Sequence, residues 1–187
     1  MACTVNLTGI TYGCDDLGIG GIVKLHLASK AAVEAVATLD TANRSITAAS
    51  GAAADIIEIE FNLKDGFSSF SEVKTVDAAG GFTTVPSITF EVPKMSNAKI
   101  TALDSMSNGP KEMVAIVQTA AGTYHAAGLD FGVYLGTVDG NSGTGRTEKN
   151  RFQVTITGEE NGLSYGFADS GTPADGGLGI YQTLTGQ

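Results

Sequence analysis

Residues 112–158 constrain the fold most, because three segments with strand patterns follow one another there with turn residues between them. Residues 113–118 form a short apolar run rich in β-branched side chains, which is typical of a buried strand. Residues 120–122 supply a turn, and residues 123–127 return as the second strand of a hairpin. Residues 152–157 alternate apolar and polar side chains, as a half-buried strand does. This stretch predicts an antiparallel sheet and shows no pattern of a reaction centre.

The same alternation extends through the rest of the chain. We expect strands at residues 4–10, at 22–28 and near Ile46, and a last short one at 178–184. Residues 67–76 and 85–92 predict the two arms of a long hairpin with its tip at 77–81. Pro86 and Pro93 cannot donate to a ladder, so they belong at strand edges or ends.

Residues 55–63 give the clearest strand pattern. One face should be buried and consists of large apolar side chains: Ile57, Ile59, Phe61 and Leu63. Four such side chains on one face are far more favourable in a core than in water. The opposite face carries Glu58 and Glu60, with no Lys or Arg between them in the sequence.

Two short helices are expected beside these strands. Ser29 can cap the first, which would extend to about Leu39, and Ser96 the second, which would stop before Gly109-Pro110. Residues 137–150 and 159–187 are Gly-rich and predict a polar loop and an irregular C-terminal segment. We therefore expect residues 1–187 to form one mainly β domain, an antiparallel β-sandwich or barrel with one or two short flanking α-helices and long loops.

The charge and the N-terminus exclude several classes of protein. A formal net charge of −9 over 187 residues disfavours free binding to nucleic acid, because binders neutralise phosphates with Lys and Arg. The first residues lack the charged and apolar regions of a secretory signal, and no apolar run has the ~20 residues of a membrane helix. Cys3 and Cys14 fit neither a CxxC pair nor a zinc site. We expect reduced thiols, with a disulfide as the alternative.

Several motifs suggest chemistry, but each lacks its required context. Residues 140–147 match a phosphate-binding loop except at Arg146, and a strand pattern follows where a helix is needed. His26 and His125 lie in predicted strands without neighbouring metal-ligand residues, so a solvated or interface role is expected for His26. The neighbouring pairs Asp15-Asp16 and Glu159-Glu160 point to opposite faces of a strand, which favours a solvated surface over an acid/base dyad. We expect no enzyme, no cofactor and no metal.

The chain resembles the major tail proteins, or tail tube proteins, of tailed bacteriophages. The resemblance covers most of the chain. It rests on the opening Met-Ala-Cys, Cys14-Asp15, Gly20-Gly21-Ile22, the strand end Phe90 to Lys94, Tyr124 to Gly128, and Glu148-Lys149-Asn150 followed by Phe152, Val154, Ile156 and Gly158-Glu159-Glu160. Where the family often has Asp-Lys/Arg-Asn-Gly-Tyr, this chain has Glu-Lys-Asn-Arg-Phe and lacks the Gly.

This resemblance implies a structural virion protein. Subunits would form rings, typically hexameric, that stack into a tube for genome delivery. They would contact other tail proteins, with DNA only as passing cargo and no membrane partner, in a virion assembled in the host cytoplasm. A head-decoration or connector protein and a surface-displayed β-sandwich adhesin or pilin are the alternatives.

Assembly by such a subunit would use its projecting segments. We expect assembly arms at residues 64–87 and 137–150, with contacts between subunits through Phe67, Phe70, Phe82 and Arg146. The face with Glu58 and Glu60 would line the lumen and repel DNA phosphates. The alternative is an acidic outer face that only aids solubility.

Overall fold

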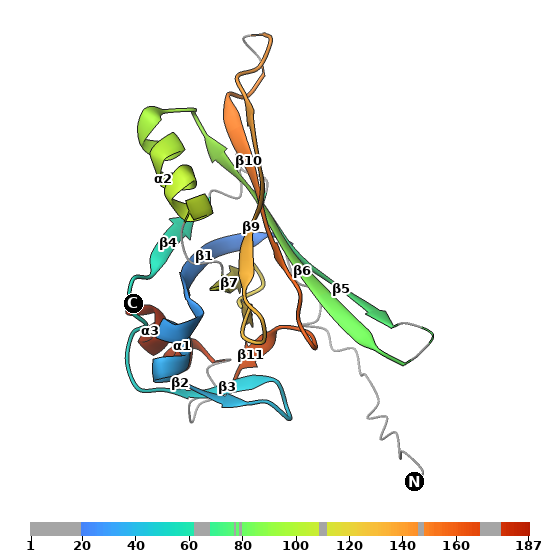
Figure 1. The fold of residues 1–187 in the computed structure, drawn as a ribbon. Coiled ribbons are helices and arrows are strands. Elements are labelled where there is room, and N and C mark those ends of the chain that lie inside the picture. The colour runs from blue at the N-terminus through green and yellow to red at the C-terminus, as the bar shows by residue number, and fades with distance from the viewer. Residues whose placement is uncertain are drawn as a thin grey trace.

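The computed structural model describes residues 20–61, 68–76, 78, 80–108, 112–145, 148–168 and 177–187. Within these ranges the fold is mainly β, with three short helices (Figure 1). The strands are β1 (Ile22–Ser29), β2 (Ala37–Asp40), β3 (Ser45–Ala49), β4 (Ile57–Glu60), β5 (Ser68–Val76), β6 (Phe82–Pro93), β7 (Met113–Thr119), β8 (Tyr124–Ala127), β9 (Val133–Asn141), β10 (Arg151–Gly158) and β11 (Tyr165–Phe167). The helices are α1 (Lys30–Val36), α2 (Asn97–Asn108) and α3 (Leu178–Thr185).

The strands join into one branched sheet with the order β2-β3-β11-β8-β7-β9-β10-β6-β5. Strand β1 branches from it, because it pairs with β7 on one side and with β4 on the other. All pairings are antiparallel except that of β11 with β3. In the described part of the chain, the ends of this order, β2 and β5, do not pair with each other. The sheet is therefore open, and the closed barrel among our expectations is not formed.

Strand β7 lies between two apolar cores, which explains its continuous apolar sequence. Its Met113, Ala115 and Val117 face a core shared with β1, β6, β10 and α2. Val114 and Ile116 point the other way, into a core built with α1, α3, β3, β8 and β11. A strand buried on both faces needs apolar side chains at successive positions, as observed here.

The β7–β8 hairpin forms as the sequence predicts. Gly122 takes φ 83° in its turn. A second glycine, Gly128, lets the chain leave β8 close to β7: its φ is 96°, and a Cβ there would lie 2.4 Å from the backbone oxygen of Met113. No side chain fits at that distance, so this glycine fixes where the β8–β9 connection passes β7.

The predicted helices form, with one difference in length. The hydroxyl of Ser29 accepts a hydrogen bond from the backbone N–H of Ala32, as an N-cap should. Helix α1 ends at Val36, however, because residues 37–40 continue as β2 and pair with β3, the strand expected near Ile46. Helix α2 ends at Asn108, next to the predicted Gly-Pro stop.

The C-terminal prediction was wrong, because residues 178–185 form helix α3. Ile180, Tyr181 and Leu184 are buried in the second core. Their spacing of one, three and four residues places them on one face of a helix, whereas it would divide them between the two faces of a strand. Gly177 precedes the helix with φ 85°.

Two further expectations need correction. Strand β4 covers only residues 57–60, and Ile57 is 47% exposed rather than buried. Ile59 and Phe61 pack against the first core as partly buried side chains, and Leu63 lies outside the described residues. The predicted loop 137–150 is a strand as far as Asn141, because Thr137 to Asn141 pair with β10. The predicted strand 4–10 lies outside the described residues as well.

Candidate assembly surfaces

The predicted long hairpin is formed by β5 and β6, which pair from Ser68↔Phe90 to Val76↔Phe82. On its other side β6 pairs with β10 only between Ser87 and Pro93. Pro86, with no N–H to donate, pairs with Glu72 on β5 but lies just past the last residue of β6 that pairs with β10, so it is at an edge on that side. The end of the hairpin therefore extends beyond the rest of the sheet, as Figure 1 shows at the lower right. We call residues 73–76 and 82–85 the arm.

Apolar side chains project from both faces of the arm. Val73 is 62% exposed and lies opposite Val85, which is 38% exposed. Val76 is 67% exposed and lies opposite Phe82, which is 52% exposed. The ammonium nitrogen of Lys74 lies 4.5 Å from the centre of the Phe82 ring, within the range of a cation–π contact. The arm thus combines two apolar cross-strand pairs with one cation.

The expected contact residues do not share one environment. Phe82 is exposed on the arm, but Phe70 is partly buried: it packs against the first core, and its ring centre lies 5.8 Å from that of His125. Phe70 therefore belongs to the base of the hairpin rather than to a free surface. Phe67 and Arg146 lie outside the described residues.

A second hairpin, formed by β9 and β10, also projects from the body (Figure 1). Near its end, the carboxylate of Glu148 accepts hydrogen bonds from the backbone N–H of Thr144 at 2.6 Å and from its hydroxyl at 3.1 Å. These bonds hold the pKa of Glu148 below its usual value. The amide oxygen of Asn141 accepts a hydrogen bond from Gly143 at 2.8 Å. This connection is thus organised by its own polar groups.

The acidic pair of β4 has a basic neighbour that the local sequence did not reveal. Lys24 on β1 lies 3.1 Å from a carboxylate oxygen of Glu58 and 3.1 Å from one of Glu60. The hydrogen bond from Lys24 lowers the pKa of Glu58. Gln187 also donates to Glu58 at 2.7 Å. The expectation of like charges without a cation was therefore wrong, because the partner comes from the paired strand, 34 residues away.

His26 is fully buried, so the expectation of a solvated or interface histidine was wrong. Its Nε2 lies 2.8 Å from the hydroxyl of Tyr181 on α3, and its Nδ1 has no hydrogen-bond partner among the described residues. Burial lowers the pKa of His26 below 6.5. Helix α3 covers this face of β1. Because residues 178–184 were predicted to form a strand, the sequence analysis did not anticipate that they would bury His26.

A buried ionic cluster joins three connections of the fold. The guanidinium of Arg44 lies 3.0 Å from the carboxylate of Asp130 and 3.7 Å from that of Glu160. Tyr165 donates its hydroxyl to Asp130 at 3.2 Å, and Arg44 lies over the Tyr165 ring at 4.3 Å. Sequence analysis missed this cluster and predicted a solvated surface for Glu160, which is 2% exposed.

Burial raises the pKa of Glu160 from 4.5 to about 7, and the neighbouring Asp130 carboxylate acts in the same direction. The backbone N–H groups of Asp130 and Phe131 donate to Glu160 and oppose this shift, but the loss of solvation is the larger effect. A perturbed carboxyl can mark a functional site. Here its partners are backbone groups and an arginine that connect loops, which indicates a structural role.

The segment after β10 connects this cluster to the hairpin. Glu160 and Thr84 exchange backbone hydrogen bonds of 2.8 and 2.9 Å. Ser164 donates its backbone N–H to the carboxylate of Glu72 at 2.7 Å and its hydroxyl at 3.0 Å. Residues 160–164 therefore hold the hairpin where the arm begins, because Thr84 lies within the arm on β6 and Glu72 directly precedes the arm on β5.

The described residues bring together no metal-binding group of three or more His, Cys, Asp and Glu side chains. In the same part of the chain, no helix has the length and apolar character that are needed to cross a membrane. Comparisons with protein-family models, with curated proteins and with solved structures gave no significant match. A functional proposal must therefore rest on the surfaces themselves and on the resemblance described above.

Proposed function

We propose that this protein is a structural virion subunit of the tail tube type. Its copies assemble into rings, hexameric as is typical of the family that it resembles, and the rings stack into a channel for phage DNA. The observation that carries this proposal is the arm, where Val73, Val76, Phe82 and Val85 are all exposed. Exposed apolar pairs on both faces of a projecting element favour contact with another protein over permanent exposure to water.

The open sheet gives a second reason. Strand β5 ends the strand order in the described part of the chain, so its outer edge offers backbone groups for pairing. Subunits of a ring or tube need such unpaired edges and projecting segments, and they need no catalytic residues. Other tail proteins would contact the ends of the tube, and DNA would pass through it without specific binding.

Negative-stain microscopy of the purified protein over a range of concentrations tests the proposal. We expect rings or tubes to appear and to lengthen as the concentration rises. Closed particles of one fixed small size would favour a head-decoration or connector protein. A monomer at every concentration that binds glycans would contradict the proposal and favour a surface adhesin.

The lumen-facing position of Glu58 and Glu60 stays a prediction, in a revised form. With Lys24 between them the local charge is that of two carboxylates and one ammonium group, so one negative charge remains. In a ring this charge would repeat in every subunit and repel DNA phosphates. The double variant Glu58→Lys and Glu60→Lys should assemble and release DNA more slowly and with a stronger salt dependence. Unchanged release at all salt concentrations would place these side chains outside the channel.

A further inference from the structure

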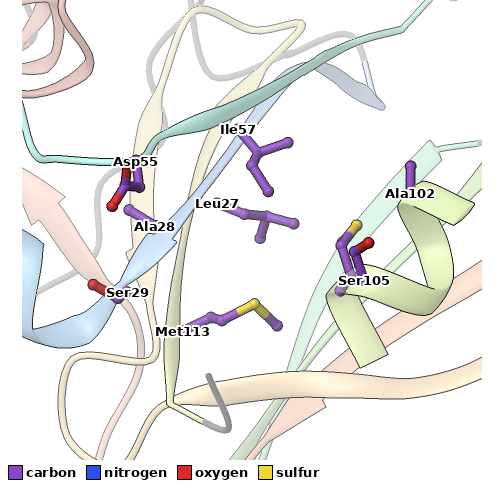
Figure 2. A pocket seen from close by; sticks show the side chains of 9 residues that line it. Leu27, Ala28, Ser29, Asp55, Ile57, Ala102, Ser105 and Met113 are labelled. Atoms are coloured by element: carbon purple, nitrogen blue, oxygen red, sulfur yellow. The ribbon is translucent and has the colours of Figure 1, made fainter. Parts of the chain in front are cut away.

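A pocket of about 500 Å³ opens between helix α2 and strands β1 and β4 (Figure 2). Its volume falls in the range of roughly 300–1,000 Å³ that is usual for binding pockets. The lining residues are mainly apolar: Leu27, Ala28, Ser29, Asp55, Ile57, Ala102, Ser105, Met106 and Met113. Figure 2 shows Leu27, Ile57 and Met113 between the Asp55 side and the helix side.

One carboxylate, that of Asp55, lies at this apolar pocket. Asp55 is exposed, and none of the described basic side chains forms an ion pair with it. In the part of the chain that the structure describes, it is also one of three non-glycine residues with positive φ, at 54°. Ile57, which the sequence predicted to be buried, is 47% exposed because it lines this opening. The pocket therefore suits a group that is mostly apolar and carries one positive charge.

The arm presents a group with this chemistry. Phe82 and Val76 are opposite each other on the hairpin, and Lys74 lies on the same face because it is two residues from Val76. The position of Lys74 over the Phe82 ring places the cation next to the apolar side chains. Figure 1 shows the arm at the lower right and α2 at the upper left, so the arm extends away from the pocket of its own chain.

We propose that the arm of one copy inserts Phe82 into the α2–β1–β4 pocket of a second copy, with Lys74 directed at Asp55. This inference rests on the proposed function in one respect, namely that copies of the chain assemble. The contact uses two different surfaces, so each subunit supplies its arm to one neighbour and its pocket to another. Such head-to-tail contacts generate a closed ring or an open filament, depending on the rotation between neighbours.

The different surfaces permit a test by mixing two inactive variants. An arm variant carries Lys74→Glu with Phe82→Ser, and a pocket variant carries Asp55→Lys with Ser105→Trp, which fills the space beside α2. Arg44 and Lys94 already adopt positive φ in this chain, so a lysine is compatible with the backbone at position 55. Circular dichroism and thermal melts establish that both variants fold. If a double variant fails to fold, the single charge reversals Lys74→Glu and Asp55→Lys replace it.

Analytical ultracentrifugation of the full chain then measures the oligomeric state of each variant and of their mixture. Each variant alone should be monomeric, and an equimolar mixture should form a 1:1 dimer, because only one arm and one pocket remain functional. A mixture that stays monomeric while the wild type assembles overturns the proposed contact and leaves the proposed function intact. Either variant assembling alone as the wild type does also overturns it. A wild type that never assembles contradicts the proposed function first, and the contact with it.

Charge exchange within one chain provides an independent readout. Lys74→Asp alone and Asp55→Lys alone should each weaken assembly about tenfold or more, because each places like charges at the contact. The two substitutions combined keep the net charge and should restore most of the affinity. Glu159→Lys, which changes an exposed carboxylate elsewhere, is the control for altered net charge. If the loss of association free energy in the double variant equals the sum of the losses in the single variants, Lys74 and Asp55 do not contact each other.

Discussion

Burial shifts the pKa values of two ionisable side chains in opposite directions. It raises the pKa of Glu160 and lowers that of His26, each relative to its value in the unfolded chain. The folded state keeps a proton on Glu160 at a pH where the unfolded state has released it, since burial raises the pKa from 4.5 to about 7. For His26 the folded state resists protonation, because burial lowers its pKa below 6.5. Both side chains therefore make stability depend on pH near neutrality.

Glu160 should make the protein less stable as the pH rises from about 4.5 to 7. In this window the folded state binds more protons than the unfolded state, so its contribution is fully present below pH 4.5 and is lost through pH 7. The variant Glu160→Gln should remove this decline in the free energy of unfolding, measured by urea titration at several pH values. The exposed neighbour substitution Glu159→Gln should not. Equal pH profiles for the wild type and Glu160→Gln would show that the carboxyl of Glu160 is not perturbed.

The hydroxyl of Tyr181 should stabilise the fold through His26. Tyr181→Phe leaves a fully buried imidazole without the partner of its Nε2, and within the described parts of the chain its Nδ1 already has none. We expect a loss of about 1–3 kcal/mol in the free energy of unfolding, as for other buried polar groups that lose a partner. Tyr134→Phe, at a 49% exposed position, is the matched control and should change stability by less than ~0.5 kcal/mol. Equal values for the two variants would mean that the bond to His26 adds nothing.

At the scale of the elements, local patterns predicted the strands that contact their neighbours in sequence. The β7–β8 and β5–β6 hairpins, β10, α1 and α2 follow from alternation, turns and caps. The predictions were wrong where the structure depends on contacts between residues far apart in the sequence. Lys24 reaches Glu58 only because β1 pairs with β4, and α3 covers His26 although 155 residues separate His26 from Tyr181. A single sequence does not reveal which distant elements will meet.

The end of the β9–β10 hairpin should matter for assembly and not for folding. Glu148 and Thr144 near this end bond to each other. Asn150, in contrast, accepts hydrogen bonds from the backbone N–H of Lys94 at 2.8 Å and of Met95 at 3.1 Å, so it belongs to the body. Replacing residues 142–148 by a short Gly-Ser linker keeps every residue of β9 and β10 that pairs, and it keeps Asn150. We expect the melting temperature of the monomer to change little and the tubes to be lost or shortened. Tubes of normal length from this variant would exclude the hairpin end from the assembly contacts.

At the scale of the whole molecule, the fold presents a packed body with two projecting hairpins. The body is fixed by two cores that share β7, and residues 160–164 hold the β5–β6 hairpin at the start of the arm through Thr84 and Glu72. The exposed apolar side chains are thus carried by a firmly attached element. This arrangement favours a contact formed with little loss of conformational entropy. The pattern of the sequence indicated the hairpin and Phe82, but it did not indicate the pocket that we infer as its partner.

The central claim is that copies of this chain associate through the arm. Sedimentation velocity over a wide concentration range, on the wild type and on Phe82→Asp, tests it most directly. Leu184→Ala is the control, because it should cost about 2–5 kcal/mol of folding stability in the second core while leaving the arm unchanged. We expect wild type and folded Leu184→Ala to assemble alike, and Phe82→Asp to stay monomeric with a nearly unchanged melting temperature. Assembly of Phe82→Asp at wild-type concentrations, or a wild type that is monomeric throughout, would contradict the claim.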